Sequence, residues 1–597
     1  MSYRAPLKDM LFVMNELARL SEVCELPTCE EATPELAQAV LEEAARFAEN
    51  VVAPLNQTGD KSPAEWRDGA VTTTPGFAAA FAQFVTGGWQ GVQHPQAYGG
   101  QGLPKLIATP CIEMLNAANL SFALCPLLTD GAIEALLTAG SPALQQRYVP
   151  KLVSGAWTGT MNLTEPQAGS DLALLNTRAV PAEDGAFKLF GTKIYITYGE
   201  HDLAENIVHL VLARLPDAPA GVKGISLFVV PKYLSAADGS LGARNDVRCL
   251  SLEHKLGIKA SPTAVLQYGD QGGATGYLVG EAHHGLEYMF VMMNAARFAV
   301  GVQGIALADR AYQRALAYAR ERVQSRPVDG SAKQSVTIVH HPDVIRMLSS
   351  MRAQTEAARA LAYVAAAASD LARGAGELAM RERYQAEYEF LVPIVKGWST
   401  EMAVEVTSLG VQVHGGAGYI EETGAAQHYR DARILTIYEG TTAIQANDLV
   451  GRKTLRDGGK VVRALLQRVG ETERELAGHA QDDDLSAILP QLRAARQAFE
   501  SVVSFVLERA SSDPNAVFAG AVPYLKLAGI VLGGWQMARA ALLSRARTEQ
   551  DGDFHSAKIA TARFFAEHVL SQAPGLCIAI TSARGDQGVL ALNPATL

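Results

Sequence analysis

One carboxylate stands between an aromatic residue and a glycine in the most informative part of this sequence. The segment RDARILTIYEGTTAIQANDLVGRKTL, at residues 430–455, places Glu439 directly after Tyr438 and directly before Gly440. A carboxylate in a pocket that excludes water has a raised pKa and becomes a better base for a weakly acidic proton. The glycine allows the backbone to approach a ligand closely. Most isolated glutamates are surface residues, so this interpretation depends on the surrounding motifs.

Two further segments have residue types suited to ligand contact. MNLTEPQAGSDL at 161–172 combines a hydroxyl-bearing turn with a glycine, and QVHGGAGYIEE at 412–422 contains two adjacent glycines. Taken alone, the first is also an acceptable turn, and KIYIT at 193–197 is also an ordinary strand. The chain has no GxGxxG motif after an expected strand, which argues against a nicotinamide-binding Rossmann domain.

The order of these segments resembles the acyl-CoA dehydrogenase family, whose catalytic segment has RDA followed by IYEGT and IQ. The resemblance covers residues 36–455. With its additional helical C-terminus, the chain is similar to the long bacterial form of the family, which includes fatty acyl-CoA and methylmercaptopropionyl-CoA dehydrogenases. The resemblance implies a helical N-terminal domain, a central β domain and a helical bundle.

The resemblance also implies a reaction, the FAD-dependent α,β-dehydrogenation of a fatty acyl-CoA to a trans-2-enoyl-CoA in fatty acid β-oxidation. Glu439 is then the base that removes the α-proton, and flavin N5 receives the hydride. Some members of the family place the base one helix earlier, where this chain has Ala296. The amide of Glu439 and the small Gly440 are expected at the thioester carbonyl. Arg297 is expected near the CoA moiety or in a structural ion pair.

Three alternatives stay open at this point. The substrate can be methylmercaptopropionyl-CoA or another short-chain acyl-CoA, or the enzyme can be an acyl-CoA oxidase that passes electrons to oxygen. A flavin-containing DNA-binding homologue is disfavoured, because the C-terminal arginines are mixed with acidic runs such as DDD at 482–484.

Positions that match the family's flavin contacts fall into two groups. Those expected within one subunit are Leu163, Thr164, Gly169, Ser170, Tyr195, Thr197 and Thr441. Those expected to reach the flavin of a neighbouring subunit are Arg322, Gln324, Gln412, Gly415 and Gly416. Arginine suits this role because its planar fork binds phosphate oxygens.

Several of these positions carry further expectations. Tyr195 stands where the family usually has Trp, and either ring can form a wall of the isoalloxazine site. The Thr197 hydroxyl is placed to hydrogen-bond flavin N5, and Ser170 is expected near the entrance shared with CoA. Ser325 and Arg326 replace the commoner Phe-Gly pair, a departure that affects the adenine contacts.

The composition is typical of a globular enzyme. The 597 residues are 48% hydrophobic and 19% charged, and the formal net charge of -10 gives no general attraction to nucleic acid or anionic membranes. The N-terminus resembles neither a secretory signal nor a transit peptide. No uninterrupted apolar run is long enough to span a bilayer, and the best candidate, at 528–543, is broken by Arg539. We therefore expect a cytoplasmic enzyme without integral membrane association.

The expected partners are small molecules and proteins. The six cysteines include no CxxC pair, and His340, His341 and His414 lack the spacing of a metal site, so no metal is expected. By resemblance, an electron-transfer flavoprotein is the electron acceptor. Flavin contacts that cross subunits imply a homodimer.

The distribution of helix-forming and strand-forming residues divides the chain into segments. Ala- and Leu-rich stretches at helical spacing flank a middle region of short β-branched runs, which predicts an α+β, mainly α, protein with the acyl-CoA dehydrogenase fold. The expected parts are an N-terminal extension at 1–35, a helical domain at 36–158, a β domain at 159–280, a helical bundle carrying the catalytic Glu at 281–458, and a C-terminal helical domain at 459–597.

Overall fold

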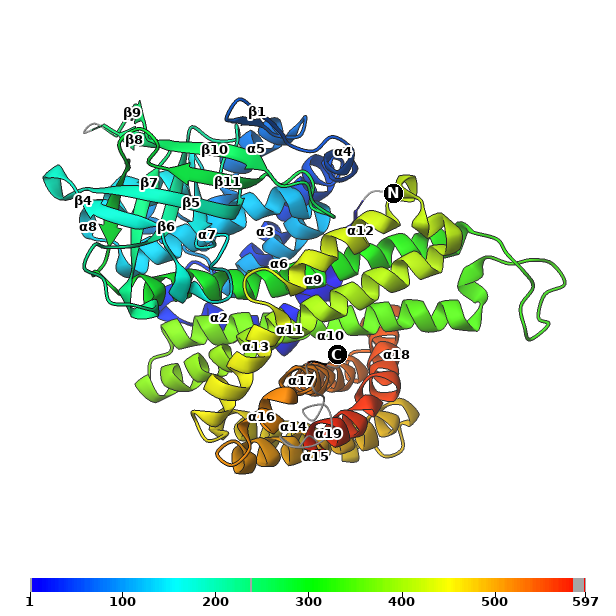
Figure 1. The fold of residues 1–597 in the computed structure, drawn as a ribbon. Coiled ribbons are helices and arrows are strands. Elements are labelled where there is room, and N and C mark those ends of the chain that lie inside the picture. The colour runs from blue at the N-terminus through cyan, green and yellow to red at the C-terminus, as the bar shows by residue number, and fades with distance from the viewer. Residues whose placement is uncertain (1–2, 237–238, 583–594, 596–597) are drawn as a thin grey trace.

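Helices dominate the structure, and a sheet domain occupies one side of it (Figure 1). The computed structural model describes residues 3–236, 239–582 and 595. The expected α+β class, mainly helical, is confirmed. The N-terminal part contains α1 (Leu7–Phe12), α2 (Leu20–Cys24), α3 (Pro34–Phe47), α4 (Leu55–Lys61), β1 (Glu65–Arg67), β2 (Ala70–Thr72), α5 (Phe77–Thr86), α6 (Lys105–Ala118), α7 (Leu120–Ala139) and α8 (Pro142–Val153).

The β domain follows α8. Its strands are β3 (Trp157–Asn162), β4 (Arg178–Pro181), β5 (Phe187–Thr197), β6 (Asn206–Arg214), β7 (Ile225–Pro231), β8 (Tyr233–Ser235), β9 (Leu241–Arg244), β10 (Val247–Leu252), β11 (Thr263–Tyr268) and β12 (Ala274–Val279). One sheet runs in the order β10-β11-β5-β12-β7-β6-β3, and β4 pairs with β5 and β6. The long strand β5 pairs with β12 near its start and with β11 near its end, so it joins the two halves of the sheet.

Three long helices form the centre of the bundle. They are α9 (Gly285–Glu321), α10 (Pro342–Gly374) and α11 (Leu378–His414), and the short helices α12 (Ala425–Ala432) and α13 (Thr442–Asp448) follow them. Glycine lets α9 and α11 approach closely. A Cβ atom at Gly301 would lie 2.5 Å from the Val395 carbonyl oxygen, and one at Gly304 would lie 2.6 Å from that of Ser399.

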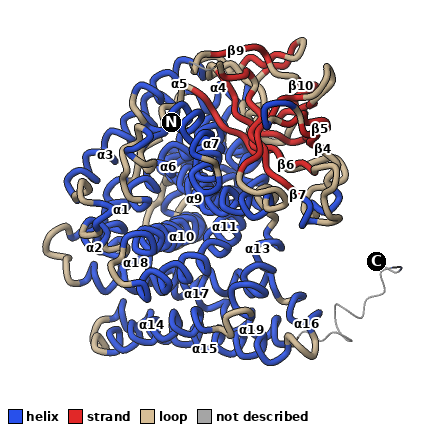
Figure 2. The backbone as a smooth tube through the Cα atoms, turned by 90° about the vertical axis from the view of Figure 1, so that its left-hand side faces the viewer, coloured by secondary structure: helices blue, strands red, loops and turns tan. Residues whose placement is uncertain are grey.

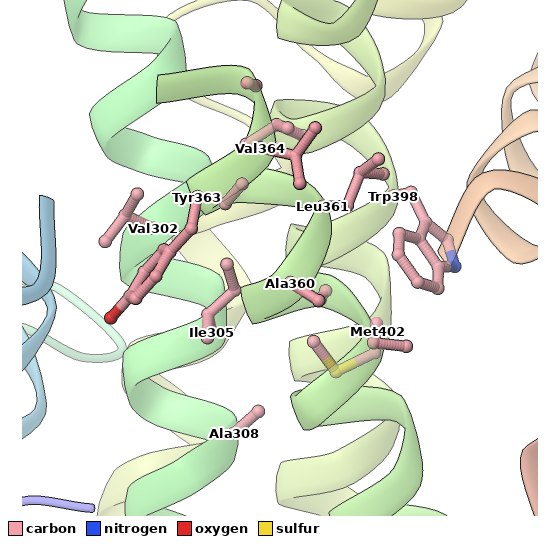
Figure 3. Close-up of a cluster of buried hydrophobic side chains, with 14 of the residues drawn as sticks. Val302, Ile305, Ala308, Ala360, Leu361, Tyr363, Val364, Trp398 and Met402 are labelled. Atoms are coloured by element: carbon pink, nitrogen blue, oxygen red, sulfur yellow. The ribbon is translucent and has the colours of Figure 1, made fainter. Parts of the chain in front are cut away.

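An apolar cluster fills the space between these helices (Figure 3). Its labelled members are Val302, Ile305 and Ala308 of α9, Ala360, Leu361, Tyr363 and Val364 of α10, and Trp398 and Met402 of α11. Many of the α10 residues are alanines, which allow neighbouring helices to pack side by side with little intervening volume. The bundle is therefore a close-packed frame for the residues on its surface.

The C-terminal helices form a layer beneath α10 and α11 (Figure 2). They are α14 (Lys460–Ala477), α15 (Asp483–Arg509), α16 (Pro514–Ala519), α17 (Ala521–Arg545), α18 (Gly552–His568) and α19 (Ala573–Thr581). Helix α17 meets the bundle through small residues. A Cβ atom at Gly529 would lie 2.3 Å from Trp398 Cγ, and one at Gly397 would lie 2.4 Å from Leu525 Cδ2.

Three helices in the described part of the chain are long and apolar enough to cross a membrane: α7, α9 and α17. The sequence-based expectation considered uninterrupted apolar runs alone, and these helices reach the length with a few charged residues included. Their most apolar windows are 83%, 67% and 83% buried within the protein. In α17, Arg539 donates to the Gln536 side chain and to the Leu17 carbonyl oxygen. Most of the apolar surface of these helices is therefore buried against other parts of the protein.

A buried network of charges links the two ends of the chain to the bundle. Arg359 of α10 lies 2.7 Å from Asp9 of α1 and 2.6 Å from Glu113 of α6. Lys558 of α18 also contacts Asp9 and lies 2.6 Å from Glu356. Each buried charge has a partner of opposite sign, which offsets the cost of removing it from water. The N-terminal extension is thus an integral part of the core.

The network generates a stability prediction. Lys558→Met is expected to lower Tm strongly, because Asp9 and Glu356 would lose a buried cation, and breaking a buried pair costs roughly 3–5 kcal/mol. Lys8→Met is the matched control, since Lys8 pairs with Asp551 at the exposed surface. Scanning calorimetry measures both variants, and equal changes in Tm would contradict the prediction.

Candidate functional site

A cavity of about 970 Å³ lies between the β domain and the bundle. Its volume is at the upper end of the range of roughly 300–1,000 Å³ found for small-molecule and cofactor sites. It brings together ten of the residues predicted from the sequence: Leu163, Thr164, Gly169, Ser170, Tyr195, Thr197, Arg297, Glu439, Gly440 and Thr441. These residues come from the loop after β3, from the end of β5, from α9 and from the segment before α13.

The other predicted flavin contacts lie away from this cavity, at the distal ends of α9 and α11. They are Arg322, Gln324, Gln412, Gly415 and Gly416. The Arg322 guanidinium donates to the Gln324 side chain at 3.3 Å, and His414 stacks on Tyr318 with ring centroids 4.4 Å apart. Within one chain these residues do not reach the cavity. Their contribution to the flavin site of a second subunit stays a prediction.

The alternative base position is an alanine in the core, and two of the histidines contact backbone carbonyls. Ala296 is buried in the core between the β domain and α9. His414 Nδ1 lies 2.7 Å from the Gly410 carbonyl oxygen, and His341 Nε2 lies 2.7 Å from that of Gln324. The described residues contain no group of three or more His, Cys, Asp or Glu side chains that could hold a metal ion.

An ion pair fixes the loop after β3 to strand β5. Lys193 Nζ of β5 lies 2.8 Å from Glu165 Oε1 and donates to the Leu163 carbonyl oxygen at 2.9 Å. Glu165 also accepts hydrogen bonds from the backbone N–H groups of Asn176 and Thr177. Although burial opposes ionisation, Lys193 and these donors lower the pKa of Glu165 to about 2. The loop is thereby held against the sheet, with its far side on the cavity.

The end of β5 presents an aromatic ring and a hydroxyl to the cavity. Tyr195 has the left-handed φ of +61° and keeps 60% of its surface exposed. Thr197 pairs with Thr263 in β11, so its backbone position is set by the sheet. Around Gly169, on the facing loop, a Cβ atom would meet nothing within 4 Å. An exposed aromatic side chain beside open space suits a flat ring ligand.

Glu439 occupies a strained turn on the bundle side of the cavity. Its φ is +54°, and that of Gly440 is +89°. A left-handed conformation costs a residue with a side chain roughly 1–2 kcal/mol, so the turn needs support from its neighbours. Tyr438 donates to the Gln303 side chain on one side of the turn, and Thr441 caps α13 on the other by accepting from Ile444 N–H at 3.4 Å. The turn is therefore tied to α9 and to α13.

The surroundings of Glu439 suit a base. Burial raises the pKa of Glu439, while the cations Arg297 and Lys396 act against this rise. The Arg297 guanidinium lies 3.7 Å from the Asp448 carboxylate. Burial lowers the pKa of Arg297. A carboxylate with a raised pKa, kept in reach of two cations, can accept a proton and can also return to the ionised form.

Several residues of this site could not be identified by motif. Lys255, Tyr438 and Arg433 line the cavity, and Lys396 and Gln445 lie directly behind the Glu439 turn. One signal in the sequence could have found Lys396. It is a single charge in the apolar run LVPIVKGW, at 391–398 within the expected bundle. A buried charge in such a run lowers the stability of the folded protein, so it indicates a specific interaction or function.

The chain matches family models along most of its length. The acyl-CoA dehydrogenase N-terminal domain matches residues 34–156, the middle domain 160–270 and the C-terminal domain 283–453. The model described as acetyl-CoA dehydrogenase C-terminal like matches residues 462–592. The chain therefore belongs to the acyl-CoA dehydrogenase family, and it is one of the members that carry an additional C-terminal domain.

Two relatives match nearly the full chain. A 3-methylmercaptopropionyl-CoA dehydrogenase of Ruegeria pomeroyi is 54% identical over 573 residues, 96% of each chain. A broad-specificity linear acyl-CoA dehydrogenase of Mycobacterium tuberculosis is 33% identical over 593 residues, 95% of each chain. Among solved structures, Caenorhabditis elegans ACDH-11 has a TM-score of 0.76 at 20% identity, with 95% of this chain and 92% of that one covered. An acyl-CoA dehydrogenase of Bacillus anthracis has a TM-score of 0.73 at 23% identity, with 95% and 91% covered. These two structures share the fold.

The pKa of Glu165 leads to a pH-dependent prediction. A carboxyl whose pKa is lowered on folding stabilises the protein above its ordinary pKa, and this stability is lost as the pH falls through the lowered value. Glu165→Gln should therefore lower Tm at pH 7, and the deficit relative to the parent should shrink as the pH falls below about 4.5 towards 2. Thermal unfolding across this pH range measures it. A deficit that stays constant with pH would show that the charge is not responsible.

Proposed function

We propose that this protein catalyses the FAD-dependent α,β-dehydrogenation of an acyl-CoA thioester, with Glu439 as the base. One observation carries the proposal. The Glu439 carboxylate, with its raised pKa, lies in the same cavity as the exposed ring of Tyr195 and the hydroxyl of Thr197. A base on one wall and a flat aromatic site on the other are the two parts that this oxidation needs.

The residues of the cavity fit a flavin. Tyr195, whose ring is exposed, and Thr197, which carries a hydroxyl, both line the cavity and would hold the flavin ring by stacking and by a hydrogen bond. The open space at Gly169 admits a bulky group beside the loop after β3. The structure of the Bacillus anthracis enzyme is described as complexed with FAD, which supports the same cofactor here. When FAD is bound, it supplies the hydride acceptor.

The chain itself supplies the proton acceptor. The Glu439 carboxylate takes the α-proton of the thioester, and the backbone N–H of the same residue is proposed to donate to the thioester carbonyl. Phe290, Met293 and Ile434 line the cavity around this point and exclude water from the acyl group. Because Glu439 must be ionised to act, the rate is expected to rise with pH through its raised pKa.

The acyl group is proposed to be short. Identity of 54% over 96% of both chains supports 3-methylmercaptopropionyl-CoA as the substrate, which the sequence motifs left as an alternative to a fatty acyl-CoA. The more distant linear acyl-CoA dehydrogenase supports straight fatty acyl chains as the alternative. We further propose an electron-transfer flavoprotein as the acceptor, a homodimer as the working unit and the cytoplasm as its location.

Anaerobic bleaching of the flavin tests the reaction and the substrate together. The FAD-loaded protein is mixed with 3-methylmercaptopropionyl-CoA and with straight-chain acyl-CoAs of increasing length. Glu439→Gln should slow bleaching by roughly 10²–10⁴-fold, the usual contribution of a general base. Glu422→Gln, an exposed carboxylate outside the cavity, is the control and should bleach normally. Normal bleaching by Glu439→Gln would mean that another residue is the base.

Oxygen consumption distinguishes a dehydrogenase from an oxidase. With substrate and air but no added acceptor, peroxide should form slowly, and an electron-transfer flavoprotein should accelerate turnover. Rapid peroxide formation without an acceptor would replace the dehydrogenase assignment with that of an acyl-CoA oxidase.

A further inference from the structure

Lys396 lies directly behind the turn that carries Glu439. It belongs to the central helix α11, is fully buried, and donates from Nζ to the Gly440 carbonyl oxygen at 2.6 Å. The ammonium group is thus one peptide unit from the residue proposed as the base. It does not line the cavity, so it does not contact the acyl-CoA directly.

Lys396 differs from the other buried lysines of the described residues. Lys193 and Lys558 each lie against a carboxylate, Glu165 in the first case and Asp9 and Glu356 in the second. Within the described part of the chain, Lys396 has no carboxylate oxygen within 4.0 Å. A buried ammonium without a close counterion destabilises the folded protein. We therefore expect Lys396 to have a functional role that accounts for its presence.

The charges that face Lys396 come from three elements. They are Glu439 of the catalytic turn, Arg297 of α9 and Glu401 of α11 itself. Glu401 is exposed and accepts a hydrogen bond from the Thr442 hydroxyl at 2.5 Å. Burial lowers the pKa of Lys396 to about 8, while Glu439 favours its charged form. Glu439, which is half-buried, is thus the carboxylate whose charge complements that of Lys396.

The Gly440 carbonyl is the point through which the turn is held. Gln445, fully buried on α13, donates to the same oxygen at 3.2 Å and to the Glu439 carbonyl oxygen at 3.3 Å. A Cβ atom at Gly440 would lie 2.7 Å from Gln445 Nε2, so the glycine is needed for this contact. Two donors, one charged and one neutral, hold two consecutive left-handed residues in place.

We propose that Lys396 is a positioning residue for this reaction. Its ammonium group fixes the Glu439–Gly440 turn through the Gly440 carbonyl and supplies a nearby positive charge that favours the ionised form of the Glu439 carboxylate. The inference rests on the proposed role of Glu439 as the base. It assigns to the bundle core a function in the oxidation, and it explains why the apolar run at 391–398 of α11 carries a lysine.

The charge has a predictable effect on pH dependence. Removing a cation near Glu439 raises the pKa of that carboxyl, so the acid limb of the rate profile should move to higher pH. Lys396→Met should move it by about one pH unit and slow flavin reduction by roughly 10- to 100-fold, the loss expected when a base is misplaced. Lys396→Arg keeps the charge and should retain the acid limb of the parent. Lys396→Gln is a second neutral variant and should behave like Lys396→Met.

Two controls separate charge from packing. Gln445→Leu removes the neutral donor to the same carbonyl, so it should slow the reaction without moving the acid limb. Lys558→Met removes a buried lysine at the other side of the bundle, so it should lower Tm without moving the limb. Lys396→Met should have a Tm equal to or above that of the parent, because an unpaired buried charge is replaced by an apolar chain of similar length.

A second readout does not depend on turnover. Infrared difference spectra identify the carboxyl band of Glu439 by its loss in Glu439→Gln, and the midpoint of its titration is followed in each variant. A higher midpoint in Lys396→Met and Lys396→Gln, and an unchanged one in Lys396→Arg, are the expected results. An unchanged midpoint in both neutral variants would overturn the proposal. Failure of every acyl-CoA to bleach the parent flavin would instead refute the proposed function, while the titration would still show whether Lys396 controls the ionisation of Glu439.

Discussion

The requirement that dominates this structure is a carboxylate that is withdrawn from water and must still ionise. Burial favours the neutral form of Glu439, yet the proposed reaction needs the charged form. The chain meets both demands by carrying the residue on a left-handed turn, with cations at Arg297 and Lys396 near it. The helices that hold the turn must then be rigid, because a carboxylate that moves towards water would lose the raised pKa.

The arrangement of the domains follows from this requirement. The bundle provides the base, and the β domain provides the facing wall through the loop held by Glu165 and Lys193. Close contact of α9 and α11 at Gly301 and Gly304 leaves little freedom for the helices that carry Arg297 and Lys396. The cavity thus lies between two separately stabilised walls, and each wall has its own buried ion pair or cluster.

Much of this could be predicted from the sequence, because the base and the cofactor loop lie in short contiguous motifs. Glu439, the loop at 161–172 and the end of β5 fall in one cavity as expected. Lys396 and Gln445 could not be predicted, since they act through contacts between helices far apart in the sequence. The three long apolar helices were not identified as such, because the search for uninterrupted apolar runs is a stricter test than a window that tolerates a few charged residues.

The N-terminal extension was also poorly described by its sequence. It lacks a long periodic helix, yet Asp9 enters a charge network with residues more than three hundred positions away. Partners so distant cannot be recognised by local pattern. Contacts of this kind determine whether a segment is a tail or part of the core.

The contact between α11 and α17 places an evolutionary constraint on the family member as a whole. Gly397, adjacent to Lys396, has no room for a side chain because Leu525 of the C-terminal domain fills the space, and Trp398 requires a glycine at Gly529. Substitutions on one side must therefore be matched on the other. The additional domain and the bundle are therefore sterically matched, and exchange of this domain for an unrelated one would disturb the helix that supports the base.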